Sequence, residues 1–219
     1  EPLLASLKLV FGSKDRSAMW VLVSIFLWFL GYQGVLPFVT LYSTETLGTS
    51  EGIATLSAGM VAIAYALFAI PSGIVAHRIG RRKTIRISLV AVSVLILAVF
   101  FHEPFMAAAG ISGTGALLIF WALLFLFGIF WGAIVTNSFP MLWQMASYSN
   151  MGIYTGLYYF FSQGAAILAP PITGGLIDVA GYRTIFVYCA VCLMIAFVLM
   201  GLVSGGEPEK HAVDPAEVE

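Results

Sequence analysis

Neutral amides, hydroxyls and aromatic rings are the groups in this 219-residue chain whose types and spacing could bind a ligand. Trp28 and Tyr32 are four residues apart, so they would share one face of a helix. Amides can hold the hydroxyl groups of a ligand, while aromatic rings stack on its apolar faces. This pattern favours an uncharged solute with many hydroxyls, such as a sugar. The candidate ligand contacts are Trp28, Tyr32, Gln33, Trp131, Asn137, Tyr158 and Gln163.

The same residue types also have a purely structural interpretation. Tyrosine and tryptophan gather at membrane interfaces, and buried amides hydrogen-bond neighbouring helices. We favour this interpretation for Trp121 and Tyr188. For Gln33, Asn137 and Gln163, ligand contact and helix packing are equally compatible with the sequence.

No Asp, Glu, Lys or Arg lies near the middle of any long apolar run. A charge there costs at least about 2.5–3.5 kcal/mol on insertion scales and usually marks a functional site. If the chain takes part in ion-coupled transport, the coupling carboxylate therefore lies outside it. The sequence also has no H-E-x-x-H motif and no nucleophile with a nearby histidine and acid. We predict no enzyme activity, no metal site and no cofactor.

The composition is that of a polytopic membrane protein. The chain is 60% hydrophobic and only 10% charged, with a mean hydropathy of +0.98. A soluble domain carries about 25% charged residues. A net charge of −1 gives no basis for nucleic-acid binding. Because a helical span needs about 20 apolar residues, six spans are predicted at 18–42, 52–77, 84–102, 114–143, 151–179 and 184–203.

The basic residues set the predicted orientation. With six spans, both termini share one side of the membrane. That side would hold nine of the ten basic residues and the other only Arg183. The positive-inside rule then places both termini in the cytoplasm, in the plasma or inner membrane of the cell. Residues 1–17 would form an amphipathic cytoplasmic lead-in to a bundle at 18–203, and the acidic residues 204–219 a disordered tail.

Helix-bending and small residues concentrate in the later runs. Prolines remove a backbone hydrogen bond and bend helices, and small residues let helices approach closely. Gly128 and Gly132 form a G-x-x-x-G pair. Asp178 and Arg183 are predicted to form an exposed ion pair worth about 0–1 kcal/mol. The residues predicted to bend the fifth span are Pro170, Pro171, Gly174 and Gly175.

The segment from Gly73 to Lys83, GIVAHRIGRRK, resembles the G-x-x-x-D-R-x-G-R-[RK] signature of the major facilitator superfamily. In that family the signature lies in the cytoplasmic loop between the second and third helices of a six-helix half, which is also its place here. The resemblance implies an all-α integral membrane protein with six transmembrane helices, one half of a twelve-helix bundle. The lead-in and tail are similar to those of the C-terminal half. The implied cytoplasmic gate residues are Gly73, His77, Arg78, Gly80, Arg81 and Arg82.

Three further segments also resemble known transporters. Residues 164–186 resemble the G-P-x-x-G-G stretch of the family's fifth helix and of its eleventh-helix counterpart. Residues 31–42 and 152–171 are similar to sucrose-transporter-type and glycoside–pentoside–hexuronide-type symporters. That likeness implies a sugar or glycoside moved with H⁺ or Na⁺. In the family, the first and fourth helices of each half line the cavity, which agrees with the candidate contacts above.

The implied mechanism is alternating access around a site between two halves. The implied partners are the lipid bilayer, a small-molecule substrate, and an N-terminal six-helix half in the same polypeptide. Two alternatives stay open. One is a six-helix transporter that pairs with a second copy of itself, and the other is a scaffold subunit that transports nothing.

His77 stands where the signature has an acid, whose carboxylate is thought to latch the cytoplasmic face. Either this copy of the signature has lost its role, or His77 weakens or pH-tunes the latch, because imidazole gains a charge near neutral pH. On the second hypothesis, His77→Asp is expected to shift the balance of inward-open and outward-open states. Labelling of a reporter cysteine on the cytoplasmic face measures that balance, and unchanged labelling would count against the hypothesis.

Overall fold

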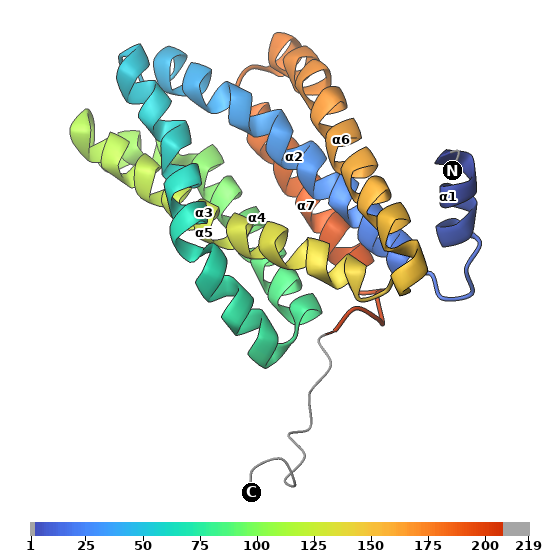
Figure 1. Cartoon of the computed structure of the whole chain (residues 1–219). Coiled ribbons are helices and arrows are strands. Elements are labelled where there is room, and N and C mark those ends of the chain that lie inside the picture. Colours follow the sequence, from blue (N-terminus) through green and yellow to red (C-terminus); the bar gives the residue numbers. More distant parts are fainter. Residues whose placement is uncertain (1–2, 208–219) are drawn as a thin grey trace, which may run out of the picture.

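The computed structural model describes residues 3–207, and that part of the chain is helical with no strand (Figure 1). A short 3₁₀ turn at Tyr148–Asn150 precedes the sixth helix. The α-helices are α1 Leu3–Phe11, α2 Ser17–Glu45, α3 Glu51–Ile79, α4 Arg81–Ala108, α5 Thr114–Trp143, α6 Met151–Ala180 and α7 Thr184–Met200.

Five of these helices, α2 to α6, are long and apolar enough to cross a membrane. Each covers one of the first five predicted spans, and α4 continues six residues beyond the predicted end to Ala108. The sixth predicted span forms α7, which is apolar but has only 17 residues. The expectation of an all-helical membrane bundle is therefore confirmed, with five clear spans and one shorter apolar helix.

The six long helices pack in a pattern with internal two-fold symmetry. Helix α2 packs on α6 and α7, while α5 packs on α3 and α4, and the two groups meet where α4 contacts α7 (Figure 1). The closely packed helix pairs correspond when α2 is matched with α5, α3 with α6, and α4 with α7. The pair α2–α6 then matches α5–α3, and the pair α2–α7 matches α5–α4. The bundle is thus built from two three-helix units, α2–α4 and α5–α7, which run in opposite directions because each has an odd number of helices.

Glycines permit the closest helix contacts in both units. A Cβ added at Gly34 of α2 would lie 2.7 Å from the Thr173 side chain and 2.8 Å from the Tyr188 ring. A Cβ added at Gly128 of α5 would lie 2.5 Å from the Val61 backbone oxygen of α3. The predicted packing role of Gly128 is confirmed. In a membrane, where lipid is as apolar as the side chains, such close backbone approach is a main source of helix association.

The prolines lie inside helices without ending them. Pro37, Pro71, Pro104 and Pro140 are each within one helix, and α6 runs unbroken through Pro170 and Pro171. A Cβ at Gly174 or Gly175 would meet no described atom within 4 Å. Open space beside these residues leaves room for α6 to move, and the predicted bending of α6 stays a prediction.

Both ends of the described chain are tied to the bundle. Phe11 of α1 stacks on Phe161 of α6, with ring centroids 6.2 Å apart. Asp15 accepts a hydrogen bond from the Ser17 backbone N–H at 2.9 Å, and its hydrogen bonds with Ser17 lower its pKa. The Ser17 hydroxyl lies 2.9 Å from the Ser204 hydroxyl. Residues 204–207, which the sequence assigned to a disordered tail, thus belong to the folded bundle, and residues 208–219 lie outside the described part.

Candidate functional site

A stack of aromatic rings joins α2 to α5 near the middle of both helices. The rings of Tyr32 and Trp131 lie nearly parallel, with centroids 4.0 Å apart and an interplanar angle of 12°. Phe127 continues the stack at 6.3 Å from Tyr32. Phe29 meets Trp131 edge-on at 5.5 Å. Offset stacks and edge contacts are the preferred geometries of aromatic pairs, worth about 0.5–1.5 kcal/mol each beyond burial.

Helices α6 and α3 contribute to the same aromatic cluster. Tyr158 of α6 meets Phe29 edge-on at 6.5 Å and Phe139 at 4.7 Å. The Tyr65 ring of α3 packs against α5 next to Trp131, where a Cβ added at Gly132 would lie 3.2 Å from its Cδ2. We define the aromatic cluster by these rings, which come from four helices: Phe29, Tyr32, Tyr65, Phe127, Trp131, Phe139 and Tyr158.

The three candidate amides have different environments. Asn137 is buried, and its Nδ2 donates to the Ala133 carbonyl at 2.8 Å. Gln33 is half-buried beside Tyr32, and Gln163 is exposed on α6. In the described structure, Gln33 and Gln163 therefore keep exposed surface, whereas Asn137 does not.

Trp28 lies apart from the aromatic cluster. Its side chain is 0% exposed, and its indole N–H is buried without a hydrogen-bond partner among the described residues. The structure thus brings together Tyr32, Trp131 and Tyr158 from the predicted contacts. Trp131, 3% exposed, and Tyr158, 7% exposed, are buried in the core as Trp28 is, whereas Tyr32 is half-buried. The sequence did not single out Phe29, Tyr65, Phe127 or Phe139. Phe29 lies three residues before Tyr32 and four before Gln33, a helical spacing that could have identified it.

The predicted gate motif is the connection between α3 and α4. Gly80 alone separates the two helices, with φ +98° and ψ 140°. Residues with a Cβ are strained at such a φ, and glycine is not. A Cβ at Gly80 would also lie 2.9 Å from Oε2 of Glu207. His77 and Arg78 are exposed, and a Cβ at Gly73 would meet no described atom within 4 Å.

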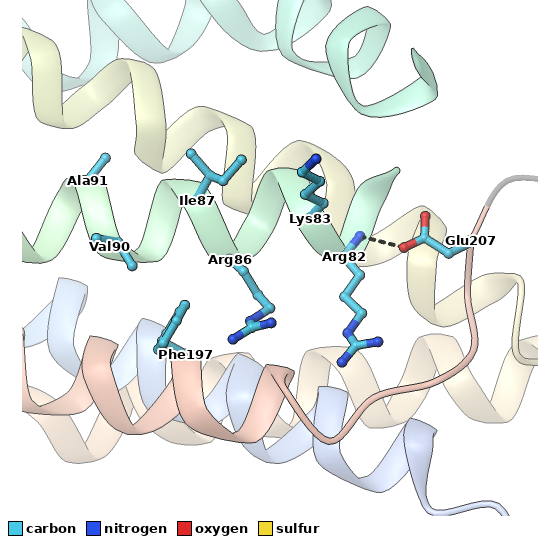
Figure 2. A pocket seen from close by; sticks show the side chains of 8 residues that line it. All are labelled: Arg82, Lys83, Arg86, Ile87, Val90, Ala91, Phe197 and Glu207. Atoms are coloured by element: carbon cyan, nitrogen blue, oxygen red, sulfur yellow. Dashed lines mark hydrogen bonds between the residues drawn. The ribbon is translucent and has the colours of Figure 1, made fainter. Parts of the chain in front are cut away.

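Glu207 supplies the carboxylate that meets this connection. Its Oε2 accepts from the Arg81 N–H at 2.8 Å, and its Oε1 accepts from the Arg82 N–H at 3.1 Å (Figure 2). These are the first N–H groups of α4, which have no partner within the helix, and a carboxylate there also favours the helix dipole. A carboxylate from residue 207 thus caps the start of α4, a contact that sequence reasoning missed.

Two arginines tie α4 and α7 together at opposite ends. At the start of α4, the Arg82 guanidinium donates to the Met200 carbonyl at 3.1 Å and to the Gly201 carbonyl. At the start of α7, the Arg183 guanidinium donates to the Phe100 carbonyl of α4 at 2.8 Å. Arg82 therefore satisfies carbonyls at the end of α7. Arg183 satisfies the Phe100 carbonyl within α4, which lacks its usual helical donor because residue 104 is a proline. We call the two contacts the arginine clasps.

The predicted Asp178–Arg183 ion pair is wrong. Arg183 lies 3.9 Å from Glu103 instead, and no pair with Asp178 occurs within 4.0 Å. The reason is the extra length of α4, which carries Glu103 past the predicted end of the span and over the start of α7.

The arginine clasps follow from a repeated sequence pattern. Gly73, Gly80 and Arg82 have the same mutual spacing as Gly174, Gly181 and Arg183. Gly181 also has a positive φ, of 82°, and is followed by the short turn into α7. This repeat is the signal that could have predicted the second clasp from the first.

Comparison with known proteins agrees with this architecture. Residues 15–219 match the family model of the Major Facilitator Superfamily. The chain belongs to the Major Facilitator Superfamily, a family of multi-pass membrane transporters, and the predicted resemblance is confirmed. Inverted three-helix repeats within each half are typical of that fold.

One characterised relative is the inner membrane transport protein YajR of Escherichia coli (strain K12). It is 38% identical over 72 residues, a stretch that makes up 32% of this chain and 16% of the E. coli protein. The match therefore spans well under two thirds of that relative, and it supports the family rather than a particular substrate.

Glu207→Ala is expected to loosen the start of α4, because two backbone N–H groups lose their acceptor. Loss of a helix cap costs about 0.5–2 kcal/mol. Hydrogen–deuterium exchange of peptides covering residues 78–90 is expected to rise. Asp178→Ala, which removes an exposed carboxylate that makes no hydrogen bond in the described structure, is the matched control. Equal exchange in both variants would contradict the assigned role of Glu207.

Proposed function

We propose that this chain is the C-terminal six-helix half of a secondary active transporter that moves a small uncharged polar solute, a sugar or glycoside. The observation that carries the proposal is the aromatic cluster, with a half-buried amide at Gln33 next to Tyr32 and an exposed amide at Gln163 on α6, the helix that carries Tyr158. The sixth span would be α7. At 17 residues it reaches the lower limit for a span, about 17 residues.

The side chains of the aromatic cluster and the three candidate amides suit a neutral ligand. Tyrosine and glutamine offer both donors and acceptors, as sugar hydroxyls require, and the flat rings suit the apolar faces of a pyranose. The helices that carry the cluster bear acids and bases only near their ends. A charged solute would find no counter-ion in this wall, whereas a neutral solute needs none.

Ion coupling would rest on the partner half. We propose that H⁺ or Na⁺ drives transport and that the coupling carboxylate lies in an N-terminal six-helix half of the same polypeptide. The neutral groups of this chain would then face an acid of the other half across a site near the bilayer midplane, as in alternating-access transporters. A scaffold role without transport is an outcome that the experiment below distinguishes, and pairing of two copies of this chain stays the other alternative.

The cell membrane is the proposed location, with the start of α4 on the cytoplasmic side. The basic residues at 78–86 lie at that end of the bundle, and those of residues 8–16 lie before α2. The positive-inside rule supports cytoplasmic termini. The arginine clasps would keep α4 and α7 together as one body while the two halves rock.

The test is solute uptake by the complete transporter in membrane vesicles, measured with a panel of radiolabelled neutral sugars. Removing one ligand hydrogen bond costs about 0.5–1.5 kcal/mol, so Gln33→Ala and Gln163→Ala are expected to raise the apparent KM by about 2–13-fold. Asn137→Ala removes a buried amide of α5 and is expected to lower uptake as well.

Gln144→Ala provides the matched control, because Gln144 is an exposed amide at the end of α5, away from the cluster. Its KM is expected to equal that of the unmodified protein. Normal insertion with no uptake of any solute by the unmodified protein would favour the scaffold role. Unchanged uptake in all three cluster variants would contradict the proposed site.

A further inference from the structure

A basic and apolar groove lies on the outside of the bundle between the start of α4 and the end of α7 (Figure 2). Its volume is about 770 Å³. Three cations and one carboxylate line one end of it, and apolar side chains line the rest. The lining residues are Arg82, Lys83, Arg86, Ile87, Val90, Ala91, Phe197 and Glu207.

Arg86 is a partly buried cation of this groove that has no counter-ion in the described structure. Its guanidinium lies over the Phe197 ring, 4.5 Å from the centroid. Its Nε is buried without a hydrogen-bond partner, and no carboxylate in residues 3–207 lies within 4.0 Å of its side chain. A partly desolvated charge without an opposite charge nearby is costly, so this position favours an anion supplied from outside.

The opposite end of the same helix pair offers an internal comparison. Arg183 lies over the Phe100 ring at 4.6 Å in a similar arrangement, but it has the carboxylate of Glu103 at 3.9 Å. The carboxylate in the groove, Glu207, is already held by the N–H groups of Arg81 and Arg82. The guanidinium–aromatic arrangement therefore occurs twice, and only at Arg86 is the acid missing.

The apolar part of the groove faces the surroundings of the bundle. Ile87 is 49% exposed and Val90 39%, and the same surface continues to Val94 and Val198 at about 60%. From Arg82 to Ala91, α4 rises about 14 Å. In a membrane protein, a surface that is charged at the helix end and apolar beyond it matches a phospholipid, whose head group is charged and whose chains are hydrocarbon.

We propose that this groove binds an anionic phospholipid from the leaflet at the Arg82 end of the bundle. Its phosphate accepts hydrogen bonds from the Arg86 guanidinium, with Lys83 adding charge at the rim. One acyl chain lies along Ile87, Val90 and Phe197. A free phosphate would use only the cationic end, and an acidic peptide would leave the apolar surface uncovered.

Native mass spectrometry of the detergent-purified chain tests the proposal with two probes, phosphatidylglycerol and phosphatidylcholine with identical acyl chains. The unmodified protein is expected to retain phosphatidylglycerol preferentially. Each cation near an anionic head group is worth about fivefold in affinity, or about 1 kcal/mol. Arg86→Gln is therefore expected to lower phosphatidylglycerol binding about fivefold, and Arg86→Gln with Lys83→Gln to lower it further.

Two controls separate a specific groove from general attraction to positive charge. Arg78→Gln removes an exposed cation of the same connection that does not line the groove, and it is expected to bind like the unmodified protein. Ala91→Trp keeps all charges but fills the groove, and it is expected to lose binding. Ala66→Trp, on an exposed position of α3, is its matched control.

Three results would overturn the proposal. Equal retention of phosphatidylglycerol and phosphatidylcholine would show that the head-group charge is not recognised. An equal loss in Arg78→Gln and Arg86→Gln would show only general charge attraction. Displacement of the lipid by an equal concentration of inorganic phosphate would show an anion site that does not use the acyl chain. Melting curves of each variant in detergent identify any loss that comes from unfolding.

Discussion

The reciprocal arginine clasps between α4 and α7 are the interactions on which the rest of the structure depends. Arg82 donates to carbonyls at the end of α7, and Arg183 at the start of α7 donates to the Phe100 carbonyl within α4, so the two helices are joined at two separate levels. Helix α4 packs on α5, and α7 packs on α2, so the α4–α7 pair joins the group of α3, α4 and α5 to the group of α2, α6 and α7. Hydrogen bonds between charged donors and backbone carbonyls are stronger than neutral ones, which suits the most extensive contact between these two groups.

The second constraint is the absence of charge from the middle of the spans. On the proposed function, this bundle would recognise a solute through rings, amides and hydroxyls, because ionised groups at this depth are costly. The aromatic cluster answers that constraint with side chains from α2, α3, α5 and α6. The same cost of buried charge explains why charged residues are concentrated at the helix ends. There, Glu207 caps α4 and Arg86 lies in a groove open to the surroundings.

Much of the fold could be predicted because a membrane leaves an apolar run few choices other than a helix. The fourth predicted span, 114–143, coincides with α5, and the signature at Gly73–Lys83 correctly indicated the family. The Arg183 pairing failed because it depended on where α4 ends. Glu207 was missed because a charged residue after the last span looks the same whether or not it folds back onto a helix.

The candidate site was harder to predict for a related reason. Phenylalanine in an apolar run carries no signal of its own, so Phe29 could not be distinguished from core packing by composition. Trp28 and Tyr32 share a helix face in the sequence, yet only Tyr32 stacks on Trp131, since the wide face of α2 contacts both α7 and α5. Sequence periodicity predicts which residues share a helix face, but the neighbouring helices determine which of those residues pack in the core and which join the proposed solute site.

The most direct test of the central claim, that the aromatic cluster forms a solute wall, is protection of a cysteine at position 33. Gln33→Cys in membrane vesicles is expected to react with a small thiol reagent, while Cys189 and Cys192 are buried and give little background. A transported neutral sugar is expected to slow that reaction, and the same sugar should not affect Gln144→Cys. Equal labelling of Gln33→Cys with and without a sugar that the protein demonstrably transports would contradict the account.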